Sequence, residues 1–215
     1  MQTVAVIDYG MSNLRSVARA LEHVAAGAHR VIVTNRPAQI ESADRVVFPG
    51  QGAIGQCMDS LRAHGLVETL KSTLESKPFL GICLGLQSLM NWSDEDGGVA
   101  CLGVLPGRVV RFADGLRDAT DGRRLKIPHM GWNQVTPTRP HPLWTDIVAG
   151  ERFYFVHSYY VRPAATTDVA ATTTYGVEFT CACARGNIFA TQFHPEKSQK
   201  AGLRLLANFL RWQGK

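Results

Sequence analysis

The stretch PFLGICLGLQ, residues 78–87, joins an apolar run to a cysteine that lies between two glycines. The apolar run predicts a buried strand, and the residues that follow predict a helix. G-x-C-x-G at Gly81, Cys83 and Gly85 is the pattern of a nucleophile elbow with cysteine in place of serine, since side chains at 81 and 85 would crowd the reversal of the chain. Cys83 is therefore either a buried thiol at a strand end or a nucleophile on a sharp turn.

Upstream of this stretch, strand-like and helix-like segments alternate. Strands are predicted at 3–8, 30–34 and 45–50, and helices after a candidate N-cap at Ser12 or Asn13 and over 54–74, with a break near Gly65. This alternation predicts an α/β fold with an open, mostly parallel sheet flanked by helices.

The second half is rich in strands. Strand-like segments lie at 104–112, 127–135, 152–161, 168–176, 179–186 and 187–193. The closing stretch 198–212 predicts an amphipathic helix through Leu203, Leu206 and Leu210, with Ser198 as N-cap. Residues 1–215 are expected to form one domain with a β-rich elaboration.

Composition favours a soluble globular protein. Of 215 residues, 45% are hydrophobic and 19% charged, and the formal net charge is +5. The start of the chain lacks the basic region of a signal peptide, and no apolar run approaches a membrane span, so we expect a cytoplasmic protein without membrane contact. The basic residues are scattered, and GRRLK at 122–126 is expected to be a solvated loop, which disfavours nucleic-acid binding.

The cysteine count also disfavours disulfides and metal. There are five cysteines, an odd number without a C-x-x-C pair. Cys181 and Cys183 would share one face of a strand, but without further ligands packing is the better interpretation. A reduced protein fits these observations.

Three segments should end at the same edge of the sheet, where ligands bind in open α/β folds: VVFPGQG, FLGICLG and FATQFHPE. In the last, Pro195 favours an extended His194, and Glu196, two residues on, would point the same way and orient the imidazole. Cys83, His194 and Glu196 then form a nucleophile, a base and an orienting acid. The alternatives are a satisfied strand-end histidine and an acid at a helix N-terminus.

FPGQGA is the third element of the site. No Lys-Ser/Thr follows it, so it is not a phosphate loop. Its glycines could aim backbone N–H groups at an oxyanion, with the N–H of Leu84 as a second donor. The alternative is an ordinary turn after a strand.

PGQGA, GICLGLQ and HPE, in this order, resemble the class I (triad) glutamine amidotransferases. IPHMGWN (127–133), YFVHSYY (154–160), HPEKSQ (194–199) and DYGMSNLRSV near the start are similar to the glutaminase subunits of imidazole glycerol phosphate synthases, in histidine biosynthesis. The resemblance covers nearly the whole chain and implies a flavodoxin-like sheet. It implies a stand-alone subunit that forms a heterodimer with a separate (β/α)₈ cyclase.

The resemblance implies a role for each matched residue. Cys83 attacks the side-chain amide of glutamine, His194 transfers protons and Glu196 holds His194. The residues implied around the substrate and its oxyanion are Gly50, Gln51, Gly52, Leu84, Gln87, Ser158 and Tyr159. Tyr154 and Lys197 match positions near the cyclase, and no metal or organic cofactor is implied.

Two segments depart from the resembled family. Position 51 is commonly small or aliphatic there and is Gln51 here, and residues 113–126 are longer than expected and should form a surface insertion. Three alternatives stay open: a glutaminase of another pathway such as vitamin B6 synthesis, an inactive regulatory subunit, and a cysteine hydrolase of similar topology.

Overall fold

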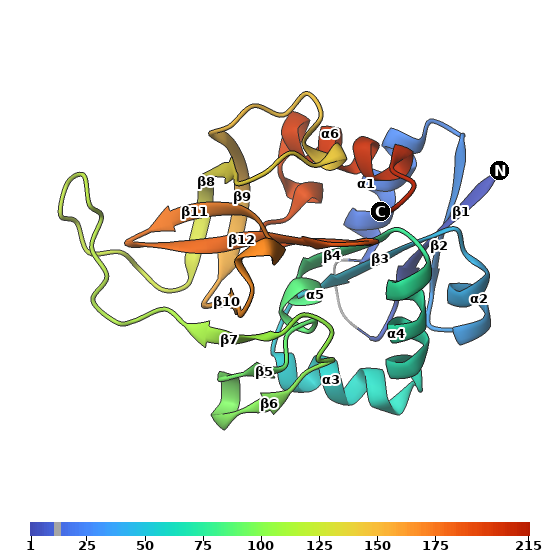
Figure 1. Ribbon diagram of the computed structural model, residues 1–215, viewed down its shortest axis with the longest axis horizontal. Helices are drawn as coiled ribbons and strands as arrows, with labels where there is room; N and C mark the ends of the chain where they lie inside the picture. The colour runs from blue at the N-terminus through green and yellow to red at the C-terminus, as the bar shows by residue number, and fades with distance from the viewer. Residues whose placement is uncertain (11–13) are drawn as a thin grey trace.

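The chain is built around one long mixed sheet with helices on both faces (Figure 1). The computed structural model describes residues 1–10 and 14–215. The sheet order is β2-β1-β3-β4-β13-β12-β10-β7-β5-β6, and β11, β8 and β9 continue outward from β12. The strands are β1 (Gln2–Ile7), β2 (His29–Thr34), β3 (Arg45–Gly50), β4 (Phe79–Cys83), β5 (Trp92–Ser93), β6 (Val99–Ala100), β7 (Gly107–Arg111), β8 (His129–Pro137), β9 (Glu151–His157), β10 (Tyr159–Pro163), β11 (Val169–Tyr175), β12 (Val177–Arg185) and β13 (Ile188–Thr191). The helices are α1 (Leu14–Ala25), α2 (Pro37–Ser42), α3 (Ile54–Ala63), α4 (Leu66–Ser76), α5 (Leu84–Gln87) and α6 (Gln199–Arg211), with short 3₁₀ turns η1 (Glu95–Gly97), η2 (Pro142–Trp144), η3 (Thr166–Asp168) and η4 (Pro195–Lys197).

The half of the sheet that runs from β2 to β13 is parallel. Every residue of β3, β4 and β13 is buried, because helices cover a parallel sheet on both sides. β4 lies in the middle, between β3 and β13. The carboxyl ends of these three strands consequently meet at one edge of the sheet.

Helices cover the two faces separately. α1 and α6 pack against each other on one face, where Leu21 and Phe209 enter one hydrophobic cluster. α2, α3 and α4 lie on the other face, where Leu61 and Leu70 enter a second cluster (Figure 1). The predicted helix over 54–74 is divided into α3 and α4 at Gly65, whose φ of +65° is the left-handed conformation that glycine adopts freely.

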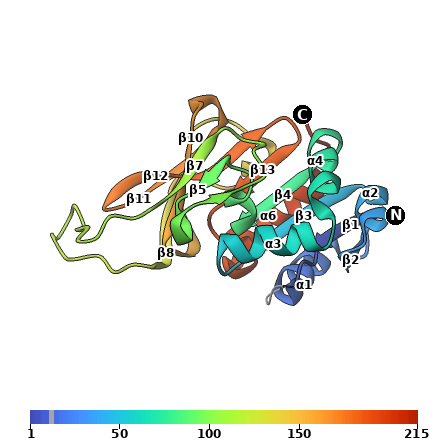
Figure 2. The same cartoon turned by 90° about the horizontal axis from the view of Figure 1, so that it is seen from below.

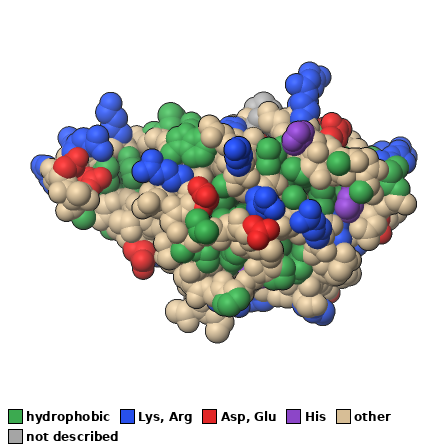
Figure 3. All heavy atoms as spheres, turned by 90° about the horizontal axis from the view of Figure 1, so that it is seen from above, with side chains coloured by type: hydrophobic (Ala, Val, Ile, Leu, Met, Phe, Trp, Pro, Cys, Tyr) green, Lys and Arg blue, Asp and Glu red, His purple; other side chains and the backbone are tan. Residues whose placement is uncertain are grey.

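The antiparallel half begins where β12 pairs with β13 and ends in the β8–β9 ladder. The insertion at 113–126 leaves this half as a long loop that projects from the body in both ribbon views (Figures 1 and 2). Its base is held where Leu116 and Leu125 approach Gly176. Lys and Arg side chains are dispersed over the face seen in Figure 3, and at the projecting end they mix with acidic ones, as expected of a solvated segment.

The predicted fold class is confirmed: an α/β fold with a parallel core, flanking helices and a β-rich elaboration. The boundaries differ in places. The run 152–161 is two strands, β9 and β10, separated at Ser158. The candidate N-caps Ser12 and Asn13 lie outside the described residues. Within the described part of the chain, no helix has the length and apolar character needed to cross a membrane.

One detail of the predictions is wrong, and two others are confirmed only in part. Cys181 and Cys183 do not share one packing environment, since each of them belongs to a different hydrophobic cluster. Register shifts between β11 and β12 disturb the simple alternation there. Ser198 stands at the N-cap of α6 but makes no capping hydrogen bond with its side chain. Leu206 and Leu210 are buried as expected, whereas Leu203 is only partly buried.

Candidate active site

Cys83 occupies a strained turn at the end of β4. Its φ of 54° and ψ of −104° are unusual for a residue with a side chain, which indicates a conformation imposed by its surroundings. A Cβ on Gly85 would lie 2.0 Å from the Phe48 carbonyl oxygen, and a Cβ on Gly81 would lie 2.9 Å from the Gly85 oxygen. Only glycine fits at both positions, as the elbow prediction requires.

β3 reinforces the elbow from the side. Gly50 is the residue opposite Cys83 in the β3–β4 ladder. A Cβ on Gly50 would lie 2.5 Å from the Tyr9 hydroxyl and 2.7 Å from the Leu84 Cβ. The PGQG turn can therefore approach the cysteine closely only because residue 50 is glycine.

The helix that follows the elbow is much shorter than the sequence suggested. α5 comprises only Leu84–Gln87, after which the chain turns toward β5. Few peptide dipoles are aligned in one turn, so the helix field contributes little negative-charge stabilisation at the sulfur. What α5 does provide is the Leu84 N–H, which as the first N–H of the helix has no intrahelical partner.

The predicted base and its orienting acid are in contact. His194 Nδ1 lies 2.9 Å from Glu196 Oε1, and both side chains are buried. His194 is extended, with φ −102° and ψ 97°, as its position before proline predicts. The route of the chain differs from the prediction, because Pro195–Lys197 forms a 3₁₀ turn rather than an extended segment.

That turn is fastened on two sides. The Ser198 hydroxyl donates to the His194 carbonyl oxygen at 2.6 Å and accepts the Tyr154 N–H of β9 at 2.9 Å. The His194 N–H donates back to the Tyr154 carbonyl oxygen at 2.9 Å. On the other side, a Cβ on Gly202 of α6 would lie 1.8 Å from the Pro195 oxygen. β9 and α6 thus fix the backbone that carries the imidazole.

The charge state of His194 follows from these neighbours. Burial alone would lower the pKa of His194, but a negative charge on Cys83 and the Glu196 carboxylate together raise it to about 10. Its Nε2 is buried and makes no hydrogen bond within the described part of the chain. The site therefore favours a charged imidazolium at His194, next to the sulfur of Cys83.

A cavity of about 420 Å³ opens onto the sulfur. It brings together most of the residues that sequence reasoning singled out: Gln51, Gly52, Cys83, Leu84, Gln87, Ser158, Tyr159 and His194. Glu196 lies behind His194, and Gly50 adjoins Cys83 through the ladder. The structure therefore collects the predicted triad and the predicted substrate residues around one space.

The amide of Gln87 is directed by a residue that the sequence analysis missed, Gln192. Gln87 Nε2 donates to the Tyr159 carbonyl oxygen at 2.9 Å and to Gln192 Oε1 at 3.1 Å. Gln192 Nε2 in turn lies 3.5 Å from Cys83 Sγ as a donor. Both amide hydrogens of Gln87 are committed, so a ligand can meet only its carbonyl oxygen. The available signal in the sequence was Q-F-H, in which Gln192 precedes the predicted base His194 by two residues.

Other residues on the cavity wall were also missed: Glu95, Pro128, Val156 and His157. Glu95 Oε2 accepts the Ile54 N–H at 2.9 Å. Burial raises the pKa of Glu95 above its usual value, although that hydrogen bond opposes the shift. Glu95 follows the two-residue strand β5, which the sequence did not predict, and it belongs to no motif, which explains why the pattern of the sequence did not reveal it.

Tyr154 and Lys197, the predicted interface residues, lie on β9 and η4 beside the cavity. Next to them β8 exposes Met130 and Trp132, which are 62% and 43% exposed. Trp132 is paired with Tyr154 across the ladder, and their rings meet edge to face at 6.1 Å. The outer side of β8–β9 is thus an apolar surface next to the site.

Three other cysteines lie outside the cavity that contains Cys83. Burial raises the pKa of Cys57 and Cys183 to about 12 and that of Cys101 to about 11, so these thiols stay protonated near neutrality. Over residues 1–10 and 14–215, no three His, Cys, Asp or Glu side chains gather as metal ligands.

Comparison with known proteins agrees with this geometry. Two solved structures share the fold: a glutamine amidotransferase (TM-score 0.70, 18% identity, 97% of each chain) and the glutaminase domain of Trypanosoma brucei CTPS with bound acivicin (TM-score 0.64, 17% identity, 98% of this chain and 94% of that one). The family described as glutamine amidotransferase class-I matches residues 5–212. The chain belongs to the class I glutamine amidotransferases.

Within that family, the similarity is more specific. The chain is 60% identical to the imidazole glycerol phosphate synthase subunit HisH of Aromatoleum aromaticum, over 99% of both sequences. It is 58% identical to the same subunit of Methylococcus capsulatus, over 99% of this chain and 98% of that protein.

Proposed function

We propose that this chain hydrolyses glutamine to glutamate and ammonia as the glutaminase subunit of an imidazole glycerol phosphate synthase. The observation that carries the proposal is that Cys83 and His194 line one cavity, and that Glu196 holds His194 from behind. Full-length identity of 60% to a HisH subunit supports the particular pathway. The proposal treats residues 1–215 as one amidotransferase domain that works in the cytoplasm.

The triad performs both halves of the hydrolysis. The Cys83 thiolate attacks the side-chain amide carbon of glutamine, and the π electrons of the carbonyl move to its oxygen. When the intermediate collapses, His194 protonates the departing nitrogen, ammonia leaves and a thioester remains. His194 then takes a proton from water, whose oxygen attacks the thioester, so that glutamate leaves and the thiolate returns. Glu196 keeps the imidazole oriented and favours its charged form.

Backbone groups next to the sulfur are suited to stabilise the oxyanion. The Leu84 N–H follows the nucleophile, and the Gln51–Gly52 segment lines the same cavity. Two donors of this kind commonly account for a factor of about 10²–10³ each in turnover. Because both would act through the main chain, Gln51 is compatible with this role despite its larger side chain.

The remaining lining groups match the polar end of glutamine. Glu95 offers a carboxylate to the α-ammonium group, and the Gln87 carbonyl oxygen is the second acceptor. Ser158 and Tyr159, at the gap between β9 and β10, complete this wall of the cavity.

The apolar outer side of β8–β9 is suited to receive the cyclase subunit. The part of this surface next to the cavity is formed by Met130, Trp132, Tyr154 and Lys197. A partner seated there would close the site and receive ammonia directly, before water protonates it. The cyclase then uses the ammonia to make imidazole glycerol phosphate and AICAR.

The test compares glutamate release from glutamine by the chain alone and by the chain with the cyclase and its ribonucleotide substrate. We expect weak activity alone and strong stimulation by the liganded cyclase. Cys83→Ala should abolish glutamine use while the complex still cyclises with added ammonia. Cys101→Ala, a half-buried thiol outside the cavity, is the matched control and should behave as wild type. Absence of stimulation by the cyclase would refute the pathway, and glutamine hydrolysis by Cys83→Ala would refute the nucleophile.

A further inference from the structure

A buried pair of histidines stands behind the cavity, His129 on β8 and His157 on β9. His129 Nδ1 is 2.9 Å from His157 Nε2, and His157 Nδ1 is 2.8 Å from the Tyr159 carbonyl oxygen. Because a carbonyl oxygen only accepts hydrogen bonds, His157 must carry its proton on Nδ1. Its Nε2 is then an acceptor, and His129 must donate from its own Nδ1. The contacts assign one tautomer to each ring.

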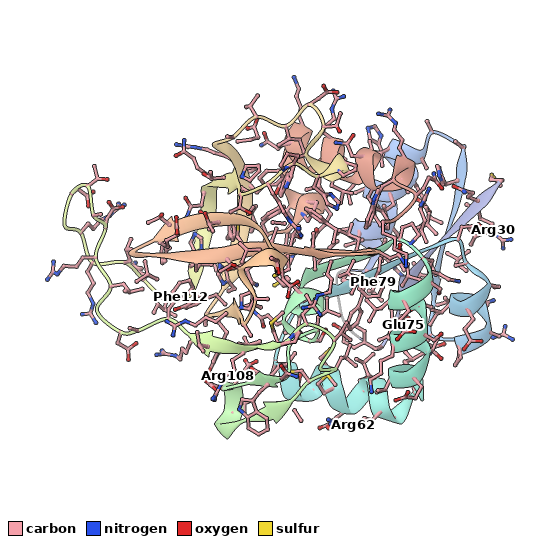
Figure 4. The ribbon with its side chains drawn as sticks, viewed as in Figure 1. Arg30, Arg62, Glu75, Phe79, Arg108 and Phe112 are labelled. Atoms are coloured by element: carbon pink, nitrogen blue, oxygen red, sulfur yellow. The ribbon has the colours of Figure 1, made fainter. Side chains whose placement is uncertain are left out.

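The pair is also required to be neutral. A proton added to His157 Nε2 would place two N–H groups against each other across 2.9 Å. The surroundings oppose such a charge: His129 stacks between Phe155 and Tyr175, and Phe112, labelled in Figure 4 just beyond β7, packs on His157. Burial lowers the pKa of His129 to about 4, and burial together with His129 lowers that of His157 to about 3.

The hydrogen-bond chain continues from this pair to the nucleophile. The Tyr159 carbonyl oxygen that accepts from His157 also accepts from Gln87 Nε2 at 2.9 Å. Gln87 donates as well to Gln192, whose amide lies 3.5 Å from Cys83 Sγ. Every link has a defined donor and acceptor, so the orientation of each amide depends on the link before it.

On the other side, the chain reaches the outer strands. Asn133 Nδ2 lies 3.4 Å from His129 Nε2, the nitrogen left as an acceptor by the tautomer. The same amide nitrogen donates to the Thr174 carbonyl oxygen of β11 at 2.8 Å. The histidine pair therefore ties the β8–β9–β11 layer to the wall of the glutamine cavity.

We propose that His129 and His157 are positioning residues for glutamine hydrolysis, which hold the Tyr159 carbonyl and through it the amides of Gln87 and Gln192 beside Cys83. This inference rests on the glutaminase activity proposed above. Both rings act through other groups: the nitrogens of His157 point to His129 and Tyr159, although its ring reaches the cavity wall.

Substitution by asparagine separates positioning from packing. An asparagine amide nitrogen occupies nearly the place of His Nδ1, whereas a glutamine amide reaches the place of Nε2. His157→Asn keeps the donor to Tyr159, and His157→Gln loses it. His129→Asn keeps the donor to His157, and His129→Phe retains an aromatic ring but leaves His157 Nε2 without its donor.

The variants are measured in the complex with the cyclase. We expect His157→Gln and His129→Phe to lower kcat/KM for glutamine at least about tenfold, the scale of one lost hydrogen bond in a site. The two asparagine variants should stay within about threefold of wild type. Cyclisation driven by added ammonia should be unchanged in all four, because only the glutamine site is affected.

A control and two further readouts separate the possible outcomes. His141→Asn is the control, since His141 is partly buried against the rings of Phe189 and Trp212, and burial lowers its pKa to about 4, but it lies away from the cavity. Alkylation of Cys83 by iodoacetamide reports on the site without requiring glutaminase activity. Imidazole ¹⁵N NMR of the free chain reports the tautomers, and we expect both rings neutral with the proton on Nδ1 at pH 7.

The proposal would be overturned if His157→Asn and His157→Gln had equal kcat/KM and equal alkylation rates, and likewise His129→Asn and His129→Phe. A proton on Nε2 of His157 would also overturn it. If the wild-type complex released no glutamate while the alkylation rates still separated the variants, the glutaminase proposal would fail and the positioning of Cys83 would stand.

Discussion

Gly85→Ala is the sharpest test of how the elbow is built. The added methyl carbon would lie 2.0 Å from the Phe48 carbonyl oxygen, where an ordinary contact is about 3.5 Å. Either the elbow or β3 must therefore move by about 1.5 Å, estimated from those two distances. β3 is paired on both sides, with β1 and β4, and cannot yield easily. We expect the free energy of unfolding to fall by about 3 kcal/mol, the upper range for overpacking.

Gly55→Ala is the matched control for that substitution. Gly55 also lies in a helix, α3, but the nearest atom to its added carbon is the Val99 Cγ2 at 3.8 Å. Here alanine should raise the free energy of unfolding by about 0.5–1 kcal/mol, because it restricts the unfolded chain. Urea unfolding of both variants followed by tryptophan fluorescence measures the difference. A Gly85→Ala protein within about 1 kcal/mol of wild type would refute the view that this close approach fixes the elbow.

Two predictions concern charge. Glu196→Gln removes the carboxylate 2.9 Å from His194, so the pKa of His194 should fall. The alkylation rate of Cys83 at pH 7, measured by peptide mass spectrometry, should then drop by about tenfold. An unchanged rate would show that Glu196 does not belong to the triad. His129 and His157 stay neutral in the folded protein to about pH 4 and about pH 3 but bind protons below about pH 6.5 when unfolded. The unfolded state thus binds more protons as the pH falls from 6.5, so each histidine should lower the free energy of unfolding by about 2 kcal/mol between pH 7.5 and 5. Urea unfolding at the two pH values measures this decrease in the free energy of unfolding. In His129→Phe the decrease should be smaller than in wild type by about 2 kcal/mol. Equal decreases in the variant and in wild type would contradict the prediction.

The sequence predicted the parts of the site that depend on local order along the chain. Cys83 between glycines and His194 before proline each carry a backbone signature, and the rule that ligands bind at the carboxyl ends of parallel strands brings them together. The prediction of the His194–Glu196 contact succeeded for an incorrect reason, since a 3₁₀ turn rather than an extended segment brings the two side chains together.

The parts that the sequence did not predict depend on register between distant strands. His129 meets His157 only because the β8–β9 ladder pairs these two residues, and a shift of one residue would place the two rings on opposite faces of the ladder. Ser198 is the N-cap residue of α6 as predicted, but its hydroxyl bonds Tyr154 of β9 and the His194 carbonyl oxygen instead of capping the helix. Hydrophobic periodicity indicates which face of a strand is buried. It does not indicate which residues of a neighbouring strand are paired with the residues of that strand.

The placement of Cys83 and His194 at the carboxyl ends of adjacent strands has a consequence for how this protein can change in evolution. Ile82 and Thr191 are paired in the β4–β13 ladder, and Cys83 comes one residue after the first and His194 three residues after the second. Their separation is set by the spacing between hydrogen-bonded strands, which insertions elsewhere do not alter. Segments such as 113–126 can accordingly lengthen, shorten or diverge among relatives without cost to the reactive pair. Loops that project from the body, such as this insertion, are then free to be reshaped for different partners while the same chemistry is retained.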